Sequence, residues 1–107
     1  YKRQAWEYET HYIASAIANL VCTLSPRRVI VGGSVRRAGQ LGETEFFRRI
    51  RATFRRLLNG YIASPSLSES AIDDYIVPPI LGDDAGICGA VALAHAALGL
   101  EYNQPLA

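Results

Sequence analysis

Apolar side chains in the first part of the chain recur at the spacing of an α-helix. They are Trp6, Ile13, Ile17, Leu20, Val21 and Leu24, with alanines between them. Residues three or four apart share one face of a helix, so the pattern predicts an amphipathic helix over residues 6–24. Ser25 and Pro26 end the pattern, because proline does not fit the interior of a helix.

A second and cleaner apolar stripe follows. Its members are Phe47, Ile50, Phe54, Leu57, Leu58 and Tyr61. Thr44 is a suitable N-cap for this helix, since its hydroxyl oxygen can accept a hydrogen bond from a free backbone N–H. Asn59 and Gly60 favour the left-handed conformation that commonly closes a helix. We therefore predict a second helix that is bounded by Thr44 and Asn59.

Two short β-branched runs lie among the helical patterns. Residues 28–31 (RVIV) predict a strand that is buried on both faces and runs into Gly32 and Gly33. Residues 75–77 (YIV) predict a second strand, which Pro78 and Pro79 end because proline has no N–H to donate to a sheet. The serine- and proline-rich residues 63–70 predict a loop before this second strand.

The most apolar stretch, residues 85–98, predicts a third helix that Gly99 ends. Asp83 or Asp84 would cap its start, where a carboxylate also faces the positive end of the helix dipole. The predicted fold class is α/β, in the order α-β-α-β-α. Two strands cannot cover the faces of three helices, so the sheet is incomplete. We expect the missing strands to precede Tyr1, which agrees with the absence of methionine.

Composition limits the chain to one small packed domain. It has 107 residues, of which 50% are hydrophobic and 20% are charged, and its formal net charge is +1. These values exclude a disordered tail and a generally basic coat for nucleic acid. Residues 85–98 are fewer than the ~20 that a membrane-spanning helix needs, so no membrane segment is expected. Cys22 and Cys88 are too few for a disulfide scaffold, which favours a reduced, cytoplasmic location.

Charge is unevenly distributed along the chain. Residues 27–56 hold nine arginines against Glu43 and Glu45, whereas residues 57–107 hold six acidic residues and no lysine or arginine. Opposite charges within one domain are usually neutralised against each other or against a partner, so we expect no direct binding of nucleic acid. Arg48, Arg51 and Arg55 share one face of the second helix. A solvated face is the main interpretation, and binding of an anion or a partner is the alternative.

The residues after the first strand are the main candidate for binding. Gly32, Gly33 and Ser34 place bare backbone at the carboxyl end of a strand, where open α/β sheets bind ligands. A tight turn that merely leaves the strand is the alternative. Gly86, Gly89 and Ala90 give the last helix a small-residue face, suited to close packing or to a hinge between lobes.

Other candidate chemistry is weak. His11 with Cys22 and Cys88 with His95 could each share a helix face, but their spacing matches no familiar zinc motif. There is no nucleophile elbow and no lysine-type phosphate loop. Asp73 and Asp74 precede the apolar second strand, and Asp83 and Asp84 are better explained as caps of the third helix. No catalytic residue and no metal ligand is therefore assigned.

Six segments in order resemble the C-terminal part of ROK-family sugar kinases, and bacterial fructokinases in particular. They are residues 6–13 (WEYETHYI), 24–26 (LSP), 28–33 (RVIVGG), 57–61 (LLNGY), 75–79 (YIVPP) and 81–86 (LGDDAG). The resemblance implies that residues 1–107 are a fragment of an actin-like ATPase, the second half of its C-terminal ribonuclease-H-like domain. The N-terminal domain would be absent from this chain.

The resemblance also implies roles for particular residues. Gly32, Gly33 and Ser34 fall on the adenosine motif and are expected to contact the nucleotide. Relatives often have a third glycine where this chain has Ser34, whose side chain would either crowd the nucleotide or donate a hydrogen bond to it. Residues 85–94 (AGICGAVALA) fall on the motif that forms a hinge helix between the two domains.

The implied activity is ATP-dependent phosphorylation of a sugar, fructose or a related hexose, with Mg²⁺ at the phosphates. The catalytic aspartate, phosphate loops, sugar contacts and zinc motif would lie upstream, and Cys22, Cys88, His11 and His95 are not that zinc site. The fragment alone is expected to be inactive. The alternative is the sugar-sensing part of a ROK-family repressor, with DNA bound by an upstream helix-turn-helix. Because its sheet is incomplete, we also expect the chain to form a homo-oligomer.

Overall fold

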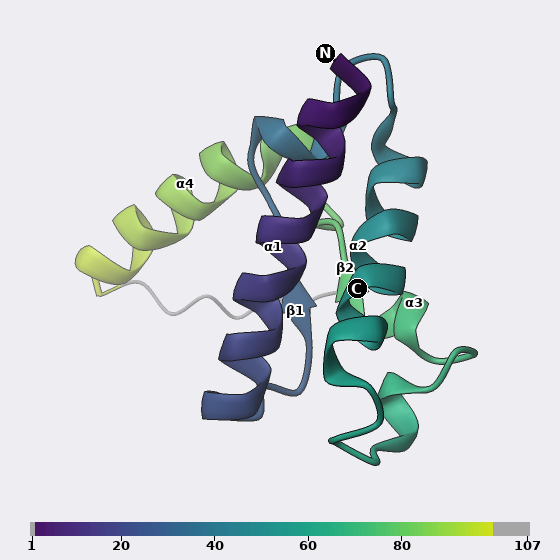
Figure 1. The fold of residues 1–107 in the computed structure, drawn as a ribbon. Coiled ribbons are helices and arrows are strands. Elements are labelled where there is room, and N and C mark those ends of the chain that lie inside the picture. Colours follow the sequence, from purple (N-terminus) through teal and green to yellow (C-terminus); the bar gives the residue numbers. More distant parts are fainter. Residues whose placement is uncertain (1, 100–107) are drawn as a thin grey trace.

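The computed structural model describes residues 2–99 and has an α/β fold (Figure 1). The helices are α1 (Lys2–Leu24), α2 (Glu43–Leu58), α3 (Ile72–Tyr75) and α4 (Ala85–Ala97), and the strands are β1 (Val29–Ile30) and β2 (Ile76–Val77). Three short 3-10 turns are η1 (Ser34–Arg37), η2 (Pro65–Leu67) and η3 (Gly82–Asp84). The four-residue α3 adds a helix to the predicted order and includes Tyr75, which was expected to be in a strand.

The core lies where α1 and α2 pack side by side (Figure 1). Phe46, Ile50 and Phe54 of α2 are completely buried, and the Phe54 ring stacks on Tyr75 with centroids 6.4 Å apart. In α1, Ile17 and Val21 are buried as predicted. The two predicted apolar stripes included too many residues. Four of their members are exposed, namely Leu20, Leu24, Leu57 and Tyr61.

The predicted end of α2 is confirmed, whereas its predicted N-cap is wrong. Asn59 has a φ of 46°, and its N–H donates to the Arg55 carbonyl oxygen over 3.0 Å. The N-cap of α2 is Gly42 rather than Thr44. The predicted start of α4 at Ala85 is confirmed, with Asp84 at the N-cap position. The Asp84 side chain makes no capping hydrogen bond, and Asp83 is paired with arginines.

The sheet is a single parallel pair in which Val29 faces Ile76 and Ile30 faces Val77. Val29 and Ile76 lie on the face toward the core, whereas Ile30 on the other face is 63% exposed. The predicted burial of this strand on both faces is therefore wrong, since Ile30 is mostly uncovered within residues 2–99. The helix α4 extends away from the α1–α2 pair (Figure 1), and none of its residues is buried.

Arginines of α2 fasten the later segments of the chain to this core. Arg51 donates from Nε to the Ile76 carbonyl oxygen over 2.9 Å, and its guanidinium lies 5.4 Å from the centre of the Phe47 ring. Arg55 donates to the carbonyl oxygen of Leu67. A solvated face does not describe these two side chains. The predicted neutralisation between the basic and acidic parts of the chain is confirmed by Arg51 with Asp73 and by Arg36 with Asp83.

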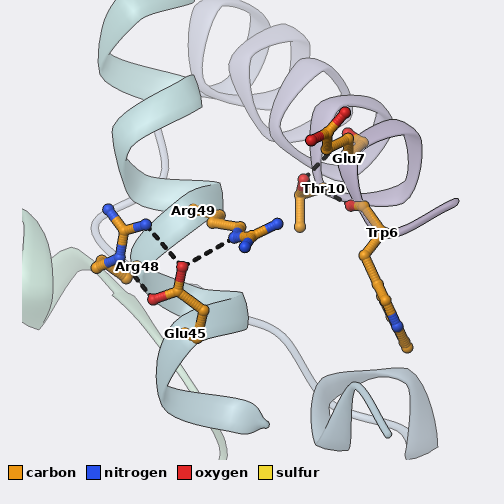
Figure 2. Close-up of polar contacts among 6 residues, drawn as sticks. All are labelled: Trp6, Glu7, Thr10, Glu45, Arg48 and Arg49. Carbon is orange, nitrogen blue, oxygen red and sulfur yellow. Dashed lines mark hydrogen bonds and ion pairs between the residues drawn. The ribbon is translucent and has the colours of Figure 1, made fainter. Parts of the chain in front are cut away.

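Near the start of α2, Glu45 lies between Arg48 and Arg49, and Arg49 points toward α1 (Figure 2). The Glu45 carboxylate accepts hydrogen bonds from Arg48 over 2.7 Å and from Arg49 over 2.9 Å. These bonds favour the ionised carboxylate and lower the pKa of Glu45 from 4.5 to about 2. The same contacts raise the pKa of Arg48. Arg48 is therefore paired within its own helix.

Replacement of Phe54 tests the position of the core. Phe54→Ala removes a fully buried ring and leaves a cavity, so we expect a loss of about 3–5 kcal/mol of unfolding free energy, or loss of the cooperative transition. Leu57→Ala is the matched control on the same helix, because Leu57 is 41% exposed, and should cost far less. Urea unfolding followed by circular dichroism measures both. Equal losses for the two variants would contradict this core.

The pKa of Glu45 can be followed by NMR titration of its side-chain carboxyl. We expect titration near pH 2, with the pair intact above pH 4.5 and lost as the pH falls toward 2. In the Arg48→Gln, Arg49→Gln double variant the pKa should return toward 4.5. Arg56→Gln on the same helix should leave it unchanged. A wild-type value near 4.5 would contradict the pairing.

Candidate functional site

Residues 32–34 leave the sheet at the carboxyl end of β1. The Val31 N–H donates to the Val77 carbonyl oxygen over 3.0 Å, so the two strands run together up to this point. Gly32 then lies beside Pro79, which follows β2. The three residues are exposed at the edge where parallel sheets offer both strand ends to a ligand.

Gly33 is explained by its backbone. Its φ of 85° and ψ of 173° fall in a region that only glycine adopts readily. A Cβ at Gly33 would meet no atom within 4 Å, so space within the chain is not the reason for glycine there. The alternative of a tight turn is sufficient for this residue.

Gly32 has no such explanation. It is not among the residues with positive φ, and an added Cβ would make only an ordinary contact of 3.8 Å with Pro79 Cγ. Neither its conformation nor its packing within residues 2–99 demands glycine. The missing side chain therefore leaves bare backbone open to a group from outside this part of the chain. Next to it, Ser34 begins η1 with an exposed hydroxyl.

Arg36 anchors the turn, and sequence reasoning did not single it out. Its guanidinium pairs with the carboxylates of Glu43 and Asp83, and its side chain is only 9% exposed. Arg37 adds a second contact to Asp83 over 2.9 Å. The uneven charge of the chain was the available signal, but it could not say which arginine would be buried.

Side-chain packing holds residues 38 and 39, which follow the glycine turn and η1. The Trp6 ring lies 3.7 Å from the position a Cβ would take on Gly39, and its edge meets the Phe46 ring with centroids 6.0 Å apart. Ala38 is buried beneath it. Trp6 points toward this segment from α1 (Figure 2). The residues that follow the glycine turn are thus held on both sides.

The other end of the sheet is fixed by Tyr75, whose hydroxyl donates to the Pro26 carbonyl oxygen over 2.7 Å. Burial raises the pKa of this phenol. Because Pro26 follows α1 and Tyr75 precedes β2, this hydrogen bond aligns the starts of the two strands. The position of the glycine turn relative to the two strands is consequently fixed.

The histidine and cysteine pairs are not assembled into a site. Cys22 and Cys88 are both exposed, on α1 and α4. Within residues 2–99, no group of three or more histidine, cysteine, aspartate or glutamate side chains could hold a metal ion. None of the helices in this range combines the length and the apolar character needed to cross a membrane.

Comparison with known proteins supplies the family. Residues 2–97 match the model of the ROK family. The chain is 42% identical over 98 residues to a Bacillus subtilis protein named "Putative fructokinase", covering 92% of this chain and 31% of that protein. It is 43% identical over 93 residues to a fructokinase of Pediococcus pentosaceus, covering 87% and 29%. A Streptococcus mutans fructokinase is 28% identical over 92 residues.

The chain spans about 30% of the length of these curated relatives. The residues matched by the family model, 2–97, include both strands, the glycine turn and α4. From a family match over residues 2–97 and two relatives above 40% identity, it follows that this chain belongs to the ROK family.

Proposed function

We propose that this chain forms the nucleotide-side wall and the hinge helix of an ATP-dependent sugar kinase, with fructose as the acceptor. Family membership and the names of the relatives support a sugar kinase. In this proposal residues 1–107 are the second half of the C-terminal domain of an actin-like ATPase. The short, half-covered sheet supports the view that further strands complete it.

The proposal rests above all on Gly32. A glycine that neither backbone conformation nor packing requires, at the carboxyl end of a parallel strand, fits close approach of a flat or phosphorylated ligand. We assign Gly32, Gly33 and Ser34 to contact with the adenosine part of ATP. Gly33 gives the turn its path, and the Ser34 hydroxyl is free to donate a hydrogen bond to the nucleotide.

The helix α4 is the proposed hinge. Its apolar side chains Ile87, Val91 and Leu93 are all more than half exposed, and Gly86 and Gly89 have open space where a Cβ would be. Such a helix gains stability only when other elements cover it. We propose that the upstream part of the protein covers it. The same uncovered faces are the reason for expecting a homo-oligomer.

The chemistry itself is assigned to the upstream part of the protein. Transfer of the γ-phosphoryl group needs a base for the sugar hydroxyl, a cradle for the phosphates and Mg²⁺ to neutralise their charge. The carboxylates of residues 2–99 do not gather into a metal site, and Asp83 is already paired with Arg36 and Arg37. We therefore give no residue of this chain a role in binding Mg²⁺ or zinc.

A kinase is preferred to a sugar-responsive repressor because the curated relatives are named for kinase activity. The sequence upstream of Tyr1 would separate the two. A phosphate loop with an aspartate base would support the kinase, and a helix-turn-helix would support the repressor.

Substitution of Gly32 tests the nucleotide contact in the full-length protein. Gly32→Val adds bulk where ATP is proposed to lie, and we expect the KM for ATP to rise on the order of 10-fold, or ~1.4 kcal/mol. The KM for fructose should change little. Gly32→Ala, which adds only the Cβ for which the chain has room, should keep the wild-type melting temperature. Ala63→Val, at an exposed loop position, is the matched control. An unchanged KM for ATP in Gly32→Val would remove these residues from the nucleotide site.

The isolated chain of 107 residues should not phosphorylate sugar. Purified chain mixed with ATP, Mg²⁺ and fructose is expected to release no ADP above the rate without fructose, since base and phosphate cradle lie elsewhere. A coupled ADP assay measures this, with the full-length protein as the positive control. Fructose-dependent turnover by the short chain would show that it carries the catalytic groups itself.

A further inference from the structure

We propose that Arg36 is a positioning residue that connects the turn at residues 32–34 to the start of α4. The affinity for ATP then depends on the position of the first residues of α4 relative to the turn. This inference rests on the proposed nucleotide role of the turn. The observation that carries it is one buried guanidinium shared between carboxylates from two other segments.

The two ends of the guanidinium reach different elements. Nη1 donates to the Glu43 carboxylate at the start of α2, and Nη2 donates to Oδ1 of Asp83 in η3. Asp83 lies 47 residues further along the chain and only two residues before α4. A single planar group thus joins the turn after β1, the first turn of α2 and the residues that lead into α4.

Burial makes this junction specific. A nearly buried arginine is tolerated only when its charge is paired, because removing an unpaired charge from water is costly. The fork of N–H groups in arginine can satisfy two carboxylates in fixed directions, which the single ammonium of lysine cannot do. Asp83 and Arg37 are each about 60% exposed, so their own pair is the weaker contact.

Both ends of the link lie in contact with neighbouring segments. Arg36 lies in η1, directly after Gly33, and Ala38 and Gly39 beyond it are held by the core and by Trp6. Gly82, just before Asp83, has a φ of 56°, and an added Cβ there would lie 3.9 Å from Nη2 of Arg36. A shift of the segment before α4 would therefore pull on Arg36 and, through η1, on the glycine turn.

The link is tested in the full-length protein with Arg36→Met, Asp83→Asn and the double variant. We expect each single variant to raise the KM for ATP about ten-fold and to leave the KM for fructose unchanged. Amide hydrogen exchange should become faster at residues 32–34 and 82–86 in both. The double variant should resemble the single ones, because the effects of two partners in one contact do not add. Arg36→Lys should restore only part of the ATP affinity.

Asp84→Asn is the matched control, since Asp84 is adjacent to Asp83 and makes no ion pair within residues 2–99. It should behave as wild type in both measurements. If Arg36→Met does not fold, Asp83→Asn carries the test, because Asp83 is 60% exposed and its loss leaves Arg36 paired with Glu43. Additive effects on the KM for ATP, or exchange at residues 32–34 that Asp83→Asn does not change, would overturn the inference.

Failure of the proposed function gives a different result. A wild-type protein that does not bind ATP would refute the nucleotide role of the turn, whereas the exchange measurements would still report whether Arg36 couples the turn to α4.

Discussion

The packing of α2 against α1 is the interaction on which the other elements of this chain depend. Phe46, Ile50 and Phe54 of α2 are completely excluded from water, and the buried side chains of α1, α3 and β2 join them in one core cluster. The strands are only two residues long and could not persist as an isolated pair. They are stable because Ile76 is buried against the helices and Arg51 holds its carbonyl oxygen. The position of the glycine turn therefore depends on the packing of α2 against α1.

Local sequence signals predicted those features that depend on neighbouring residues. Asn59 ends α2 because its left-handed conformation satisfies a nearby carbonyl group, and Pro78 ends the second strand because it lacks an N–H. Gly32 and Gly33 could be singled out as a turn after a strand for the same reason. The helical periods of α1 and α2 were also evident, since one face of each is apolar.

Features that depend on distant residues could not be predicted in this way. Asp83 is a good helix cap by its local position, but it pairs with Arg36, which is 47 residues away, and no local pattern contains that information. Leu20 and Leu24 continue an apolar stripe, yet their exposure depends on which elements reach that end of α1. Ile30 is exposed because no element within residues 2–99 packs over it, and the strand pattern alone could not show this. Residues 32–34 could therefore be nominated as a candidate site from sequence, whereas the pairing of Arg36 with Asp83 could not be foreseen.

The wide separation of the two strands along the chain affects how this fold forms. Val29 pairs with Ile76, so all of α2 lies between the two partners. Closing so long a segment costs chain entropy, and two residues of pairing on each strand cannot offset it. Docking of α2 on α1 must shorten the effective loop before the strands meet. We infer that the transition state for folding contains the helix pair without the sheet, so that the glycine turn is among the last parts of the chain to take its shape.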